Sequence, residues 1–174
     1  MVAGEVMMPV ESVAEDDVVK VSGTPKVRRF RPDDQVEAKA LILEGLKEHF
    51  GEIRHDLNPD LRDLAASYLR DGEADFLVIE LDGAVVATTG VLFERQAEAR
   101  LVRVSVRKTL RRAGLSTLLL RAVEDLCRSR SIEVLWAETE LDWADAIAFY
   151  TAMGFTERAR NATGVRLRRE VGPG

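Results

Sequence analysis

Hydrophobic positions recur with a helical period in four stretches of the chain and with a strand period in several others. The first predicted helix follows Pro32 and ends at Gly51. Its predicted apolar face contains Val36, Ala40, Leu43, Leu46 and Phe50. The second predicted helix opens at Asn58, ends at Gly72, and has on its apolar face Leu61, Leu64, Ala65 and Tyr68.

Strand-type runs flank a short turn in FLVIELDGAVVATTGVLFE, which is the clearest hairpin of the sequence. Asp82-Gly83 between the two runs is a strong signal for a type I′ turn. Gly90 inside the second run indicates a bulge or a close approach of another backbone. Further strands are expected from Val27 and at residues 100–106, 133–138, 155–159 and 165–169.

A long amphipathic helix follows the strand at residues 100–106, and its predicted buried stripe contains Leu115, Leu118, Leu119, Ala122, Val123 and Leu126. A last helix is expected near residues 144–153, before Gly154. The strand–helix–strand step over residues 100–138 predicts a parallel, right-handed crossover. The hairpins predict antiparallel pairing elsewhere. The expected fold class is therefore α/β (α+β), with a mixed, mostly antiparallel sheet, a central parallel strand pair and helices on both faces.

Composition divides the chain into a tail and one domain. Residues 1–24 are acidic, lack aromatic side chains and show no sustained period, so we expect a mobile N-terminal tail. Residues 25–171 are of ordinary length for a single domain with its own core. The net charge of −5 and the pI near 5.2 argue against nucleic-acid binding.

Few residues are suited to metal or redox chemistry. Cys127 is the one cysteine, so no intramolecular disulfide is expected, and its position favours a small core residue. The two histidines, His49 and His55, cannot alone complete a structural zinc site, so no metal is expected. No apolar run approaches the roughly 18 residues that a membrane span needs, and no signal peptide is recognised. A cytoplasmic protein without membrane partners is the simplest expectation.

The segment LRRAGLSTLLLRAVEDL at residues 110–126 places a basic pair and a glycine directly before the long helix. A helix N-terminus exposes unpaired N–H groups and the positive end of the helix dipole. Gly114 would let an anion approach the backbone, Arg111 and Arg112 would add charge, and Ser116 is small. The segment alone fits either a pyrophosphate cradle or an ordinary charged loop. It matches neither the Walker pattern nor the three-glycine dinucleotide fingerprint.

VSVRKTLRRAGLSTLLL resembles the acetyl-CoA site of the GCN5-related N-acetyltransferases (GNAT), with Arg111, Gly114 and Ser116 at its motif positions. AIAFYTAMGF at residues 146–155 resembles a second family segment, and the element order agrees over about residues 26–170. The resemblance implies the GNAT fold with a splayed central parallel pair, and acetyl transfer to a primary amine without a metal. It implies cofactor contacts from Val104, Val106, Arg111, Arg112, Ala113, Gly114, Leu115 and Ser116. Ser116 departs from the glycine or alanine usual there.

Tyr150 is the residue for which the resemblance implies a catalytic role, as the general acid that protonates the departing thiolate of coenzyme A. The alternative is a core aromatic packed on Phe149 and Phe155. Trp143 stands where relatives often carry a cofactor-binding asparagine. It could cover the pantetheine arm, line the acceptor pocket, or pack on the core as the first aromatic of a helix.

The general base is less defined, because Arg100 occupies the place where many relatives carry a carboxylate. Glu94, Glu98 and Glu138 are the candidates, with Glu140 a weaker one. Each could equally be a solvated surface carboxylate, and a bound water could serve instead. Non-catalytic alternatives also stay open, namely an acyl-CoA sensor or a protein-interaction module on the same fold. No motif decides the acceptor or whether the protein forms a homodimer.

Overall fold

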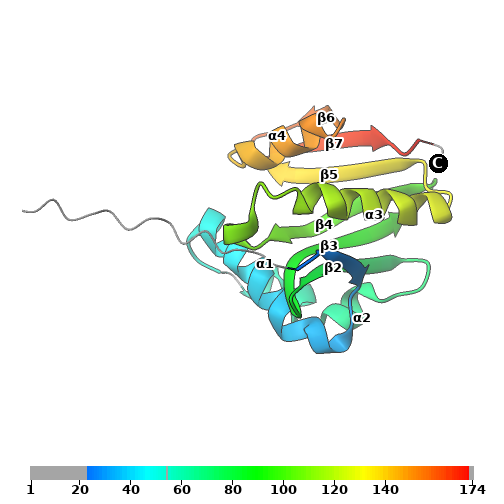
Figure 1. The fold of residues 1–174 in the computed structure, drawn as a ribbon. Coiled ribbons are helices and arrows are strands. Elements are labelled where there is room, and N and C mark those ends of the chain that lie inside the picture. The colour runs from blue at the N-terminus through cyan, green and yellow to red at the C-terminus, as the bar shows by residue number, and fades with distance from the viewer. Residues whose placement is uncertain (1–22, 54, 173–174) are drawn as a thin grey trace, which may run out of the picture.

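A seven-stranded sheet in the order β1-β2-β3-β4-β5-β7-β6 forms the centre of the fold in the described residues, 23–53 and 55–172 (Figure 1). These come from a computed structural model, and most of the predicted tail lies outside them. The strands are β1 (Lys26–Arg29), β2 (Ala74–Leu81), β3 (Ala84–Glu94), β4 (Glu98–Val106), β5 (Val134–Glu140), β6 (Thr156–Arg160) and β7 (Gly164–Glu170).

Strand pairing is antiparallel at every described step except between β4 and β5, which are parallel. This confirms the predicted mixed sheet with a central parallel pair. The β2–β3 turn is formed by Asp82 (φ 50°) and Gly83 (φ 80°), as expected for the predicted type I′ turn.

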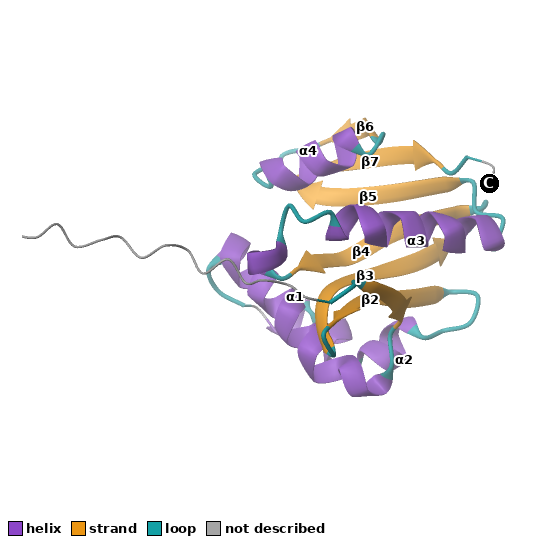
Figure 2. Ribbon diagram, in the orientation of Figure 1, coloured by secondary structure: helices purple, strands orange, loops and turns teal. Residues whose placement is uncertain are grey.

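Helices cover both faces of the sheet (Figure 2). The helices are α1 (Gln35–Phe50), α2 (Leu64–Tyr68), α3 (Leu115–Ser129) and α4 (Ala144–Ala152), with short 3-10 turns η1 (Pro32–Asp34), η2 (His55–Leu57), η3 (Pro59–Arg62) and η4 (Lys108–Leu110). Helices α1 and α2 share a core with Phe76 and Val78 of β2. Helices α3 and α4 pack on the opposite face, where Leu101 and Leu135 of β4 and β5 are buried. The centre of the sheet is therefore enclosed by helices.

The predicted apolar face of α1 is wrong in part. Val36 and Phe50 are 78% and 55% exposed, and Ala40 is also exposed. The buried positions are instead Ala38, Leu41 and Ile42, with Leu43 and Leu46 half-buried. Apolar residues occur all round this helix, so its period alone does not select one face. Packing against β3 and β4 makes that selection.

The second predicted helix is divided into η3 and α2 by Asp63, whose backbone is extended at φ −147°. Its carboxylate accepts a hydrogen bond from the Ala66 N–H at 2.9 Å and so caps α2. The predicted apolar positions Leu61, Leu64 and Tyr68 are nevertheless buried. This segment therefore covers the sheet as expected, in two pieces.

Candidate functional site

The parallel strands β4 and β5 separate in the middle of the sheet. Their pairing runs from Glu98↔Val134 to Leu101↔Ala137, after which β4 continues to Val106 and β5 to Glu140. Val104 and Val106 lie beyond the last pair, on the part of β4 that faces the opening. Backbone groups at such an opening need another partner. The predicted splayed pair is therefore present.

A bulge in β4 marks the point where the strands part. The β3–β4 register shifts between Thr88 and Gly90, and Arg103 on β4 adopts a left-handed φ of 53°. The Thr88 hydroxyl donates to the Arg103 carbonyl at 2.9 Å. A Cβ added to Gly90 would lie 2.8 Å from Cγ2 of Val102. Gly90 thus lies at the predicted irregular register, but the atoms that approach it closely belong to side chains and not to another backbone.

The Arg103 side chain ties this bulge to the turn before α2. Its Nη2 and Nε donate to the two carboxylate oxygens of Asp60 at 2.6 and 2.9 Å, and Nη1 donates to Asn58 at 2.9 Å. The Tyr68 hydroxyl donates to the same carboxylate at 2.6 Å. Burial raises the pKa of Asp60, but the hydrogen bonds from Arg103 and Tyr68 outweigh it and leave the pKa below the ordinary 3.8. A charged Asp60 therefore holds the strained residue in place.

We predict that Asp60→Asn lowers the free energy of unfolding at pH 7 by about 2 kcal/mol, since Arg103 then loses its carboxylate partner. Asp60 contributes its full stabilisation above the pKa that it has in the unfolded chain. This stabilisation is lost as the pH falls through the lower pKa of Asp60 in the folded protein. The difference from wild type should therefore shrink below pH 4. Urea unfolding at pH 7 and pH 3 measures it, with Asp71→Asn as control, because Asp71 is fully exposed and pairs with Arg29 only at 3.9 Å. Equal effects of the two substitutions would contradict the assigned role of Asp60.

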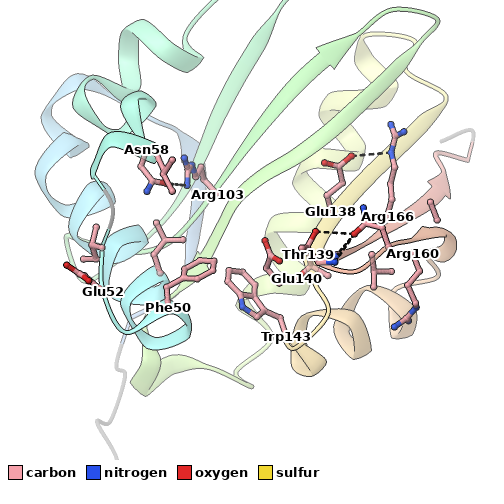
Figure 3. A pocket seen from close by; sticks show the side chains of 18 residues that line it. Phe50, Glu52, Asn58, Arg103, Glu138, Thr139, Glu140, Trp143, Arg160 and Arg166 are labelled. Atoms are coloured by element: carbon pink, nitrogen blue, oxygen red, sulfur yellow. Dashed lines mark hydrogen bonds and ion pairs between the residues drawn. The ribbon is translucent and has the colours of Figure 1, made fainter.

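Two cavities meet where the strands separate. The α4 cavity, about 350 Å³, extends along Val104 and Val106 toward the start of α3. The β7 cavity, about 930 Å³, lies between the end of α1 and the strands β5 and β7 (Figure 3). Both are bordered by Leu46, Arg103, Glu138, Thr139 and Trp143. Two molecules, one in each cavity, could therefore meet where β4 and β5 separate.

The predicted cradle lies at one end of the α4 cavity. Gly114 (φ 80°) is the N-cap of α3 and Arg112 (φ 64°) precedes it, so two left-handed residues shape the loop. The first helical hydrogen bond runs from the Leu118 N–H to the Gly114 carbonyl at 3.0 Å, which leaves the N–H groups of residues 115–117 ahead of the ladder. A Cβ at Gly114 would meet no atom within 4 Å. The loop therefore offers open, unpaired donors that fit a pyrophosphate.

The two arginines of the cradle differ in their surroundings. Arg111 donates from Nη1 to Glu48 at 2.6 Å and from Nε to the Val106 carbonyl at 3.2 Å. The Arg111 hydrogen bond lowers the pKa of Glu48, so this pair is charged at neutral pH. Arg112 and Ala113 are exposed, whereas Leu115 is buried and Ser116 borders the α4 cavity. Arg111 thus fastens the loop to α1, and Arg112 extends into solvent.

The position of Tyr150 fits both roles given for it above, a core aromatic and a residue at the predicted cofactor site. Its ring is only 7% exposed and lies 5.3 Å from the Phe149 ring and 5.2 Å from the Phe155 ring. It also borders the α4 cavity beside Val104 and Val106. No hydrogen bond of its hydroxyl is found among the described residues, and burial raises its pKa above the ordinary value. The phenol therefore stays protonated at neutral pH.

The structure separates the four carboxylate candidates. Glu94 pairs with Arg100 at 2.9 Å and Glu98 accepts from the Trp136 indole at 2.9 Å, and neither borders a described cavity. Glu138 borders both cavities and pairs with Arg166 at 3.2 Å and Arg100 at 3.5 Å.

Glu140, the weaker candidate of the sequence analysis, borders the β7 cavity. No partner of its carboxylate is found among the described residues. Its position at the end of β5 was the available signal. This end of β5 lies close to the predicted split between the parallel strands, which the structure confirms.

Trp143 connects α4 to α1 across the junction of the cavities. Its ring stacks on His49 at 3.9 Å and 25°, and lies 5.6 Å from Phe50. It borders both cavities, so it is placed both to cover a cofactor arm and to line an acceptor pocket. Cys127 is fully buried in the core, as expected, and burial raises its thiol pKa to about 12.

Two negative findings concern only the part of the chain that the structure describes. No group of three or more His, Cys, Asp or Glu side chains is arranged there to hold a metal ion. The helices found there are too short or too polar to cross a membrane.

Known proteins resemble this chain in both sequence and fold. The chain is 32% identical over 110 residues to the probable N-acetyltransferase camello of Xenopus tropicalis, covering 62% of this chain and 50% of that protein. The chain spans about half the length of the curated relatives it matches. An acetyltransferase of the GNAT family from Staphylococcus aureus Mu50 matches the fold with a TM-score of 0.78 at 22% identity, covering 86% of this chain and all of that one.

A second solved structure, the PaiA N-acetyltransferase from Thermoplasma acidophilum in complex with coenzyme A, gives a TM-score of 0.75 at 13% identity and covers 84% of this chain and 99% of that one. At these identities the two structures establish the fold alone, that of the GNAT acyltransferases. Residues 40–155, more than half of the chain, match the model of the acetyltransferase (GNAT) family. The chain belongs to this family, as its two motifs predicted.

Proposed function

We propose that the protein transfers an acetyl group from acetyl-CoA to a primary amine by direct attack within a ternary complex. The observation that supports this most is the opening between β4 and β5, where a cavity leading from an anion cradle meets a second, larger cavity. This arrangement can hold two reactants in contact without a covalent intermediate on the protein, so positioning is its main contribution.

The cofactor would occupy the α4 cavity. The N–H groups at the start of α3, with Arg112, bind the pyrophosphate, while the backbone of Val104 and Val106 binds the pantetheine amides. Acetyl-CoA then supplies a thioester, an activated acyl group, at the junction of the two cavities. Trp143 covers the arm from the α4 side. Because Arg111 holds the Val106 carbonyl, this contact would shift when the pantetheine binds.

Proton transfer is assigned to two groups. Tyr150, which carries its proton at neutral pH, gives that proton to the departing thiolate, and the phenolate regains a proton from solvent after coenzyme A leaves. Glu138 at the junction receives the amine proton through a bound water, in preference to Glu94 and Glu98, which lie away from both cavities. The cytoplasm is the proposed compartment, and no nucleic-acid partner is proposed for this acidic chain.

Calorimetric titration of acetyl-CoA followed by a thiol-release assay with a panel of amines, peptides and polyamines tests this function. We expect cofactor binding and thiol release that depends on an amine. Tight binding without release for any acceptor would support the acyl-CoA sensor instead, and no binding would support a protein-interaction module.

A further inference from the structure

The β7 cavity has an apolar wall made by the end of α1 and the turn after it. Val36, Phe50 and Leu57 are the exposed large hydrophobic residues of the described chain. Two of the three, Phe50 (55% exposed) and Leu57 (65% exposed), border this cavity, together with half-buried Leu46 and Ile53. Exposed apolar side chains gathered at the mouth of a cavity mark a surface that a ligand covers.

Aromatic rings stand at the same place. Phe50 and Trp143 lie 5.6 Å apart with an interplanar angle of 54°, and His49 already covers one face of Trp143. Figure 3 shows the Phe50 and Trp143 rings next to each other at the edge of the cavity. Tilted and edge-to-face contacts at such distances are favourable for aromatic groups. A further ring from a ligand could extend this pair.

The charge that faces the cavity without a partner is negative. Each arginine at its border has an acidic neighbour: Arg103 binds Asp60, Arg160 binds Glu157 at 2.6 Å, and Arg166 pairs with Glu138. Glu140 has no such neighbour among the described residues, and Figure 3 shows its side chain beside Trp143. A cationic ammonium group is therefore the charge that this cavity attracts.

From this combination we infer that the acceptor is a small primary amine with an aromatic or branched apolar group on a short link. The inference rests on the proposed function. The acceptor binds as an ammonium at Glu140, with its apolar group against Phe50, Leu57 and Trp143. The nitrogen attacks at the junction with the α4 cavity after it has lost a proton through water to Glu138. A second cation in the acceptor would lie at the apolar wall, where Glu52 is exposed to solvent, so it gains less there than an apolar group does and polyamines are disfavoured.

Initial rates of thiol release with 2-phenylethylamine, ethylamine and 1,5-diaminopentane test the inference. We expect a KM for 2-phenylethylamine about tenfold or more below that for ethylamine, as the ring leaves water. The diamine should bind no better than ethylamine. Release with equal KM values for all three, or the lowest KM for the diamine, would overturn the inference while leaving the proposed function intact. No thiol release with these three amines, when another acceptor of the wider panel does support release, would overturn the inference alone. No release with any acceptor of that panel would overturn both.

A matched pair of variants on α1 tests the apolar wall. Phe50→Ser should raise the KM for 2-phenylethylamine about tenfold and leave that for ethylamine unchanged. Val36→Ser removes an even more exposed residue from the same helix, away from the cavity, and should change neither value. Glu140→Gln should raise the KM for both amines. Equal effects of Phe50→Ser and Val36→Ser would overturn the assignment of the wall.

Discussion

A Gly114→Glu variant is expected to lose acetyl-CoA binding, with an affinity at least about 100-fold below wild type by calorimetry. The new carboxylate would project into the open space that now surrounds the glycine, which is the space assigned to the pyrophosphate. The new carboxylate would repel the pyrophosphate of acetyl-CoA and would itself occupy the free N–H groups that bind this anion in the wild type. The left-handed φ of 80° adds a stability cost of about 1 kcal/mol for any side chain.

The Gly72→Glu variant is a control that separates the stability cost of a side chain at a left-handed glycine from the loss of acetyl-CoA affinity. Gly72 has nearly the same φ, 78°, and equally open surroundings, but lies in the turn before β2, away from both cavities. The Gly72→Glu variant should therefore lose as much stability as Gly114→Glu and keep the acetyl-CoA affinity of the wild type. If Gly114→Glu also kept its affinity, the cradle would lie elsewhere.

Tyr150→Phe is expected to lower kcat by about 100-fold or more, the scale of a lost general acid, with little change in acetyl-CoA affinity. The hydroxyl has no hydrogen-bond partner among the described residues, so its removal should barely change the melting temperature. The raised pKa also means that ionisation of Tyr150 should not reduce turnover up to pH 10, the ordinary value of a tyrosine.

The second tyrosine of the chain gives a crossed control. Tyr68 donates its hydroxyl to Asp60 at 2.6 Å and lies away from both cavities. Tyr68→Phe should therefore cost about 1 kcal/mol of stability while keeping most of the turnover. Wild-type turnover in Tyr150→Phe would remove this residue from the proton pathway and leave the core interpretation.

Features set by neighbouring residues could be predicted from the sequence. The Asp82-Gly83 turn depends on two adjacent residues, and the parallel crossover depends on element order. The irregularity at Gly90 was also predicted, because a glycine within a strand has few other reasons to occur. The cradle proposed at Gly114 rests on the resemblance of its motif to the family, because a glycine before a helix also fits an ordinary loop, and it stays a prediction.

Features set by distant contacts could not be predicted. The left-handed residue in β4 is Arg103, which depends on Thr88 across the strand pair and on Asp60 from another layer. The buried face of α1 depends on the sheet beneath it. Whether Glu138 or Glu98 lies at the junction depends on where β4 and β5 part, which no local pattern encodes.

Initial-rate kinetics with acetyl-CoA and a primary amine both varied test the central claim most directly. Two reactants that meet at the junction of the two cavities must be bound together before transfer, so the double-reciprocal plots should intersect. Parallel lines would indicate an acetylated enzyme intermediate instead. Such lines, or no thiol release at any concentration of either reactant, would contradict the proposed ternary complex.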